Sequence, residues 1–279
     1  MLLFEWRRVS KLKLTTLEWL LVAAGGVLLL KLLGPQWRSY ATTDARTFNV
    51  VGDIDYGDKG RTAQNLVSGS PNRIVLLGDF GYERSASTWW NSSTMKPVRD
   101  SGIPVIAVLG NHDKSSDYLK IFGQSGWDFS RTIGNTRFVA INTQSPNLSS
   151  AESKVKAGQN DPAIRWVVPI MHKCIVTPQG SHHPPEVSIS FHKMFQKYSK
   201  VKLVLQAHNH NYFRSVKNGI TYIVVGSGGR KFYVDSSDMW TKAHIPNTYG
   251  VLKCNTSSTS ISCRFVDNGG ATRDSFSVT

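Results

Sequence analysis

Short apolar runs alternate with polar loops and helix-like stretches along most of the chain after residue 46. These runs predict buried strands at residues 47–52, 73–78, 103–110, 138–143, 164–171, 201–207 and 221–226. Helices are expected at residues 61–69, 86–102, 115–123 and 185–200. From Tyr249 onward the pattern is typical of antiparallel strands, with turns at residues 256–259 and 267–270. This alternation predicts an α/β domain, in which functional groups collect beyond the carboxyl ends of the strands.

One longer apolar segment precedes this pattern. Residues 17–33 carry no charge except Glu18 and Lys31, and a helix of that length rises to about 25 Å, close to the thickness of a bilayer core. The basic cluster at residues 7–13 favours a cytoplasmic N-terminus. We therefore expect a basic cytoplasmic segment at 1–16, a transmembrane signal anchor at 17–33, a linker at 34–46 and an extracytoplasmic domain at 47–279.

A cleaved signal peptide is the alternative for this segment, and cleavage would give a secreted protein. The uninterrupted apolar run from Trp19 to Leu30 has the length of a signal-peptide core. However, the nearest small-x-small sequence, at residues 39–41, lies far beyond that run. The sequence therefore favours the anchor over cleavage.

The composition indicates an anion-attracting surface on one globular domain without repeats. The net charge is +14 and the pI is near 9.8, which suits phosphorylated substrates, anionic lipid or nucleic acid. Nucleic acid is possible but is not otherwise indicated, because the sequence shows no aromatic-rich basic groove. The pattern predicts no particular oligomeric state.

Cys254 and Cys263 flank a polar tip between two strand-like runs, so a hairpin would bring them close. Outside the cytoplasm such a pair can form a disulfide, although two unpaired thiols fit the same pattern. Cys174 is left over.

Polar side chains follow five of the predicted strands at the point where each strand ends. They are Asp53, Asp79, Asn111 with His112, His172, and His208 with His210. Gathered at one edge, carboxylates and imidazoles are costly to bury, and a divalent cation is the usual compensation. Oxygen and imidazole donors without thiolates suit Zn, Fe or Mn, and the set is large enough for two ions.

The sequences "GDID", "GDFGY", "GNHD", "VPIMH" and "AHNH" resemble the five ordered motifs of the calcineurin-like metallophosphoesterase superfamily, over residues 47–279. The Gly-Asp-x-x-Tyr pattern of Gly78, Asp79 and Tyr82 is most similar to the purple acid phosphatase branch. The resemblance implies an α/β (α+β) four-layer sandwich, with two mixed β-sheets flanked by helices.

The resemblance also implies a ligand set for two divalent or trivalent transition-metal ions. Asp53, Asp79, Tyr82 and His210 would hold one ion, and Asp79, Asn111, His172 and His208 would hold the other, with Asp79 as the bridge.

Three further residues are implied as catalytic. His112 would reach the phosphoryl group, oriented by Asp113, and His183, of the pair His182–His183, would assist the leaving group. An exposed loop is the alternative role for that pair.

Asp55 departs from the family pattern, because most of the superfamily has a metal-binding histidine there and purple acid phosphatases have glycine. Either Asp55 or Tyr82 could therefore complete the first metal site. Ala207 replaces the usual glycine before the last histidine pair, and we expect this change to affect only backbone packing.

The expected function is hydrolysis of phosphate esters by attack of a metal-bound hydroxide, with a phosphomonoester as the favoured substrate. A phosphodiesterase or nuclease is an alternative within the same class of enzyme. A non-catalytic, membrane-anchored protein that binds anions or nucleic acid on the same fold is the alternative from another class.

Overall fold

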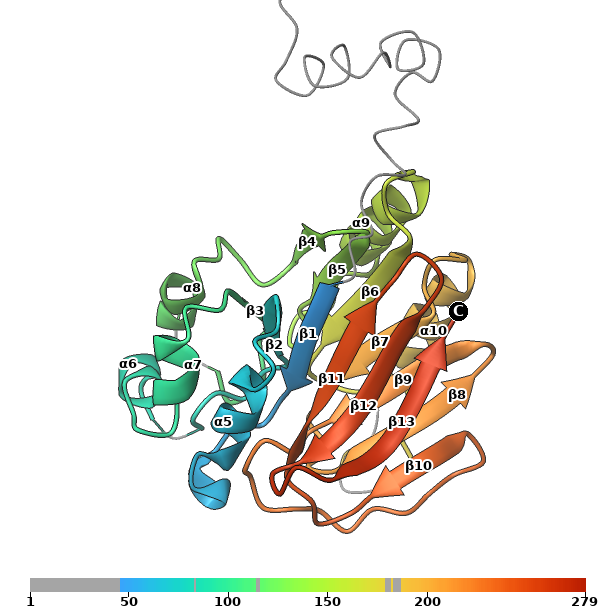
Figure 1. Cartoon of the computed structure of the whole chain (residues 1–279). Coiled ribbons are helices and arrows are strands. Elements are labelled where there is room, and N and C mark those ends of the chain that lie inside the picture. Colours follow the sequence, from blue (N-terminus) through green and yellow to red (C-terminus); the bar gives the residue numbers. More distant parts are fainter. Residues whose placement is uncertain (1–45, 83, 114–115, 179–181, 183–186) are drawn as a thin grey trace, which may run out of the picture. The chain divides into compact units, whose positions relative to one another are not determined.

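Two mixed β-sheets pack face to face in the computed structural model, which describes residues 46–82, 84–113, 116–178, 182 and 187–279 (Figure 1). The predicted anchor at 17–33 and its flanking segments lie outside these residues. Within the described residues, no helix is both long and apolar enough to span a membrane.

The first sheet combines the amino-terminal strands of the domain with its carboxyl-terminal hairpins. Its order is β13-β12-β11-β1-β2-β3, with β1, β2 and β3 parallel to one another. Its strands are β1 (Arg46–Val51), β2 (Arg73–Leu76), β3 (Val105–Ala107), β11 (Gly250–Thr256), β12 (Ile261–Asp267) and β13 (Thr272–Val278).

The second sheet is built from the middle of the chain. Its order is β10-β8-β9-β7-β6-β5-β4, in which β5, β6, β7 and β9 run parallel. Its strands are β4 (Phe129–Ile133), β5 (Thr136–Ile141), β6 (Trp166–Met171), β7 (Leu203–Gln206), β8 (Tyr212–Lys217), β9 (Ile220–Val225) and β10 (Thr241–Ile245).

Helices cover the outer faces of both sheets and complete four layers. On the side of the first sheet lie α5 (Arg61–Val67), α6 (Ala86–Trp90), α7 (Lys96–Asp100) and α8 (Asp117–Phe122), after the short 3-10 turn η2 (Tyr56–Asp58). On the side of the second sheet lie α9 (Leu148–Asn160) and α10 (Ser188–Gln196). The predicted α/β sandwich is therefore confirmed for the described domain.

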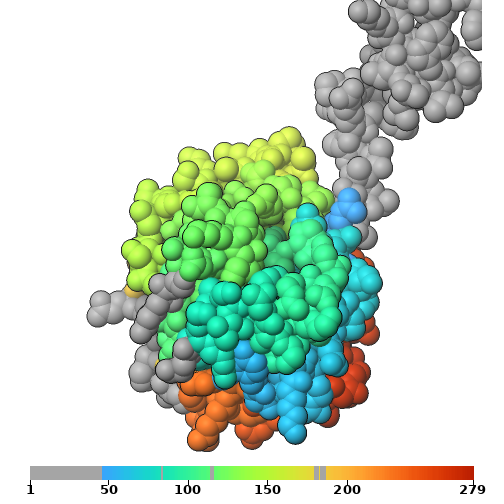
Figure 2. Space-filling view, turned by 90° about the vertical axis from the view of Figure 1, so that its left-hand side faces the viewer, coloured from blue at the N-terminus to red at the C-terminus, as the bar shows by residue number. Residues whose placement is uncertain are grey.

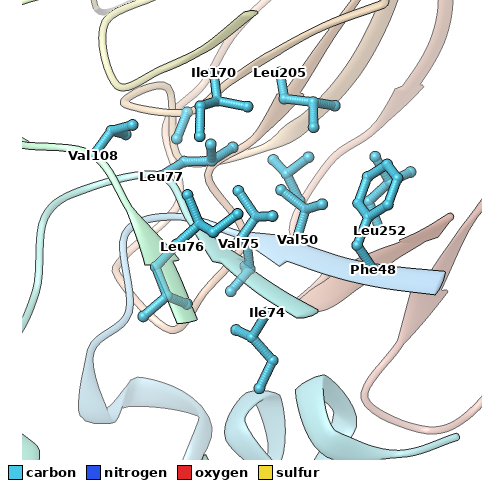
Figure 3. Packing of buried hydrophobic residues seen from close by; sticks show 14 of the residues in the cluster. Phe48, Val50, Ile74, Val75, Leu76, Leu77, Val108, Ile170, Leu205 and Leu252 are labelled. Atoms are coloured by element: carbon cyan, nitrogen blue, oxygen red, sulfur yellow. The ribbon is translucent and has the colours of Figure 1, made fainter. Parts of the chain in front are cut away.

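The main core lies between the two sheets. Ile170 and Leu205 of the second sheet face Val50 and Phe48 of the first, whereas Ile74 points to the helix side (Figure 3). Strand β6 is buried at every position, as expected for a strand that is covered on both faces. This packing holds the carboxyl ends of β1, β2, β3, β6 and β7 at fixed positions.

The elements that differ from the sequence prediction have local causes. The helix expected at 86–102 is two helices, α6 and α7, because a polar turn separates them and Pro97 lies in the first turn of α7. Helix α9 and strands β4, β8 and β10 were not predicted. Cys254 and Cys263 are directly paired across β11 and β12 and form a disulfide.

Candidate metal centre

The loops after the strands hold their polar residues in an unusual backbone conformation. Asp53, Asp79, Tyr82 and His208 have φ values of 58°, 56°, 51° and 69°, in the left-handed region that residues other than glycine rarely adopt. Such conformations cost free energy and persist where the surrounding fold enforces them, which is common at functional sites. Four of the predicted ligands therefore lie at positions where the fold enforces this conformation.

A first group of donors surrounds Asp79, which is 1% exposed. The Nε2 atom of His172 lies 3.4 Å from Asp79 Oδ2, 3.1 Å from Asn111 Oδ1 and 3.1 Å from His208 Nδ1. Donor atoms of Asp79, His172 and His208 all lie within 4.8 Å of one another. This spacing suits a single metal ion that they share.

A second group surrounds Asp53, which is fully buried. Tyr82 Oη lies 3.2 Å from Asp53 Oδ1 and 3.2 Å from His210 Nε2, and His210 Nε2 lies 3.4 Å from the same carboxylate oxygen. The other oxygen, Oδ2, accepts the backbone N–H of His208, 2.9 Å away. That bond ties the second group to the first.

Backbone carbonyl groups fix the orientation of two of the imidazoles. His172 Nδ1 lies 2.7 Å from the carbonyl oxygen of Leu77, and His210 Nδ1 lies 2.8 Å from that of Lys231. Because a carbonyl oxygen can only accept, each Nδ1 carries a proton and each Nε2 points at the carboxylates. Histidine ligands of metals are commonly held by such a bond.

The electrostatics around Asp53 and Asp79 favour the binding of a cation. Burial would lower the pKa of His172, but the carboxylates of Asp79 and Asp53 outweigh it and raise that pKa to about 9. Burial and the charge of His172 lower the pKa of His208 to about 3. Burial, with the charges of Asp53 and Asp79, raises the pKa of Tyr82 far above its ordinary value. No lysine or arginine among the described residues pairs with Asp53 or Asp79, so the donor set fits a metal.

Asp113 supports the loop that carries Asp79. Its carboxylate accepts the backbone N–H groups of Asp79 at 2.8 Å, Gly110 at 2.7 Å and Phe80 at 2.6 Å. Gly110 is required here, because a Cβ at that position would lie 2.1 Å from Asp79 Oδ1. We expected Asp113 to orient His112, but its hydrogen bonds hold the backbone at Gly110, Asp79 and Phe80 instead.

His112 lies at the exposed rim of the centre. Its backbone N–H donates to Asp79 Oδ1 at 2.9 Å, and its ring centroid is 4.7 Å from that of Tyr82. The imidazole itself is exposed, so it is free to contact a substrate.

Asp55 is held by two arginines rather than by the donor groups. It forms ion pairs with Arg84 at 3.1 Å and with Arg230 at 2.8 Å. Burial opposes its ionisation, but the hydrogen bonds from Arg230, Tyr56 and Arg84 lower its pKa. The guanidinium of Arg230 also lies 4.1 Å from the ring centroid of Tyr82. The geometry therefore favours Tyr82 over Asp55 as the group next to Asp53.

Two other sequence expectations meet the structure at this site. His182 stacks on His208 with ring centroids 4.1 Å apart, whereas His183 lies outside the described residues. Ala207 lies close to Gly52, because a Cβ added at Gly52 would lie 2.4 Å from the Ala207 side chain. Sequence reasoning missed Arg84 and Arg230, since arginines in loops carry no spacing signal.

Comparison with known families agrees with this geometry. A family model described as calcineurin-like phosphoesterase matches residues 46–212, so the chain belongs to the calcineurin-like phosphoesterase family. Members of this fold bind divalent metals, and Asp79, His172 and His208 form a candidate metal site in this chain. A search of curated protein sequences finds no match.

Solved structures share the fold at low sequence identity. One is GAP50, the anchor in the inner membrane complex of Plasmodium, with 14% identity, a TM-score of 0.64, and coverage of 84% of this chain and 89% of that one. PhoD has 12% identity, a TM-score of 0.63, and coverage of 85% and 70%. A dimetal phosphatase from Danio rerio has 12% identity, a TM-score of 0.59, and coverage of 84% and 98%.

Proposed function

We propose that this protein is a dinuclear metal-dependent phosphoesterase. Asp53, Tyr82 and His210 would hold one ion, Asn111, His172 and His208 would hold the other, and Asp79 would bridge them. The observation that carries this proposal is the pair of donor groups, whose carboxylates Asp53 and Asp79 are buried without a balancing lysine or arginine among the described residues. Iron, zinc and manganese all suit oxygen and imidazole donors.

Two bound ions would act as Lewis acids that activate water and compensate negative charge on a phosphoryl group. The residues of the chain divide the remaining work. His112 lies at the rim, where its imidazole can hydrogen-bond a phosphoryl oxygen or give a proton to the leaving alkoxide. Asp113 fixes the Asp79 loop and thereby the spacing of the donors.

A phosphomonoester is the proposed substrate class. The similarity of the Gly78-Asp79-x-x-Tyr82 motif to purple acid phosphatases supports it, and the net charge of +14 favours the approach of doubly charged anions. A phosphodiester is the alternative, because the donor groups alone do not discriminate between the two esters.

We also propose that the domain lies outside the cytoplasm, attached by the apolar segment at 17–33. The disulfide between Cys254 and Cys263 supports an oxidising compartment. A protease-protection assay on sealed vesicles tests this placement: protection of the domain when the outer face is exposed to protease would contradict it.

Hydrolysis assays on the full-length chain test the proposed activity. The chain is stripped with EDTA, supplied with Mn, Zn or Fe, and assayed with 4-nitrophenyl phosphate and bis(4-nitrophenyl) phosphate. We expect turnover only with metal, and faster turnover of the monoester. Faster turnover of the diester would make a phosphodiester the substrate class. Folded, metal-loaded protein that turns over neither ester would contradict the proposed enzymatic activity and favour a binding protein.

A further inference from the structure

A pocket of about 500 Å³ opens at the edge of the domain formed by β3 and β4, away from the metal centre. Figure 2 faces this edge and shows a hollow between the green and the teal surfaces. The pocket lies at the amino-terminal ends of β2 and β3, opposite the carboxyl ends that carry the metal centre.

Four cations and several apolar side chains line this pocket. The cations are Arg73, Arg99, Lys120 and Arg131, and no aspartate or glutamate is among the lining residues. At the rim, Arg99 meets Asp100 at 3.4 Å and Lys120 meets Asp117 at 3.0 Å. Arg73 and Arg131 form no ion pair with a carboxylate in the described part of the chain. Their charge is therefore available to an anionic ligand.

Strand β3, which lines part of the pocket, is an edge strand of the first sheet with one open backbone position. Towards β2, the carbonyl of Pro104 accepts the N–H of Ile74, and Val108 donates to Leu76. On the outer side, the side-chain amide of Gln124 bonds both backbone groups of Ala107, at 2.9 and 3.0 Å.

Backbone groups of alternate residues in a strand point to the same side. Val105 therefore directs its N–H and C=O outward, as Ala107 does. Within the described residues, no protein group bonds them, and Val105 lines the pocket.

We propose that this pocket binds an extended acidic segment of a partner protein, which adds as a short strand beside β3. The backbone of the segment would pair with Val105, its carboxylates with Arg73 and Arg131, and an apolar side chain would pack on Trp90 and Phe122. Strand addition of this kind takes affinity from main-chain hydrogen bonds and specificity from side-chain pockets.

Other occupants fit these observations less well. Residues 1–45 of the chain itself carry more basic than acidic residues, so they lack charge complementarity. An anionic lipid headgroup would meet the cations, but it would leave the outward N–H and C=O of Val105 without a strand-like partner.

Fluorescence anisotropy with the full-length chain tests the proposal. The probe is a fluorescein-labelled heptapeptide of alternating glutamate and leucine. One control peptide has lysine in place of glutamate, and another has N-methyl groups on alternate backbone amides. We expect saturable binding of the first peptide, at least tenfold tighter than that of either control, with and without EDTA.

Charge-reversed variants locate the binding. Arg131→Glu should weaken binding at least tenfold, and Arg131→Gln by less. Arg264→Glu, the same change at an exposed position of β12, should alter binding by less than twofold. Unchanged thermal melting establishes that each variant folds.

Several outcomes would overturn the proposal: no saturable binding by the wild type, equal binding of the N-methylated peptide, or equal loss in Arg264→Glu. Phosphatidylserine vesicles test the alternative that the pocket binds an anionic lipid. Vesicle binding lost in Arg131→Glu, without discrimination among the peptides, would assign the pocket to lipid instead. Because none of these readouts uses hydrolysis, they are independent of the proposed phosphoesterase activity.

Discussion

The carboxylates at two places in this domain, half-buried Asp274 and buried Asp53 with Asp79, are balanced in different ways. Asp274 on β13 accepts the hydroxyl of Tyr212 at 2.8 Å and two nitrogens of Arg214 on β8 at 2.8 and 3.0 Å. Asp53 and Asp79 also contact a tyrosine hydroxyl and imidazoles, but no guanidinium or ammonium among the described residues pairs with them. The fold completes the charge balance where two sheets are joined, and leaves it open where a metal would bind.

The largest expected effect separates these two groups by activity. Asp79→Asn should lower kcat for a chromogenic phosphomonoester on the order of 10³-fold or more, because the bridging charge is lost. Asp274→Asn is the matched control and should stay within about threefold, since its carboxylate serves packing and charge balance alone. Full activity in Asp79→Asn would contradict the proposed difference between the Asp79 site and the Asp274 site.

His112→Asn tests the group that contacts substrate without holding metal. The loss of a proton donor at the rim should lower kcat by about 10²- to 10⁴-fold, while metal content measured in the same preparation stays unchanged. Parallel loss of metal and turnover would instead make His112 a residue of the metal site.

Asp113→Ala tests the support of the Asp79 loop. Three backbone N–H groups lose their acceptor, and we expect a destabilisation of about 3 kcal/mol, seen as a fall in Tm of roughly 6–12 °C. Asp113→Asn retains an acceptor oxygen, so its Tm should fall less than that of Asp113→Ala. A Tm unchanged in both variants would show that water replaces the carboxylate.

The smallest effect concerns the stability contributed by Asp274. Burial opposes its ionisation, but Arg214 and Tyr212 lower its pKa below the ordinary value of 3.8. Its ionised form therefore stabilises the fold above that pH, and this contribution is lost as the pH falls through the lowered pKa.

We expect Asp274→Asn to reduce the free energy of unfolding by about 1–2 kcal/mol at pH 7, a discounted value for a partly exposed pair. Urea titrations of both proteins at pH 7 and pH 3 should show the gap narrowing at the lower pH. A gap that widens at pH 3 would contradict the sign of the pKa shift.

The strands and the donor residues could be predicted because each has a local signal. A short apolar run that ends in glycine and then Asp53, Asp79 or Asn111 carries both the strand and its polar end within a few residues. The family match covers residues 46–212, the part of the chain that contains all five motifs. Parallel strands then deliver these groups to one edge without any further information.

The features that were missed depend on contacts between distant segments. Helix α9 buries only Ala151, Val155 and Gly158, so its apolar stripe is too narrow to detect. Asp55 pairs with Arg230, which lies 175 positions further along the chain, and no periodic pattern in the sequence predicts that contact. Asp113 was expected to orient an imidazole, because the sequence shows its neighbour His112 but not the three amides that it accepts.

Elemental mass spectrometry on the full-length chain tests the central claim most directly. After incubation with Mn, Zn and Fe and removal of free metal, the wild type should retain close to two transition-metal equivalents per chain. Asp79→Asn should retain fewer than one, and Asp274→Asn should match the wild type. Folded wild-type protein that retains no metal would contradict the dinuclear site on which the proposed function rests.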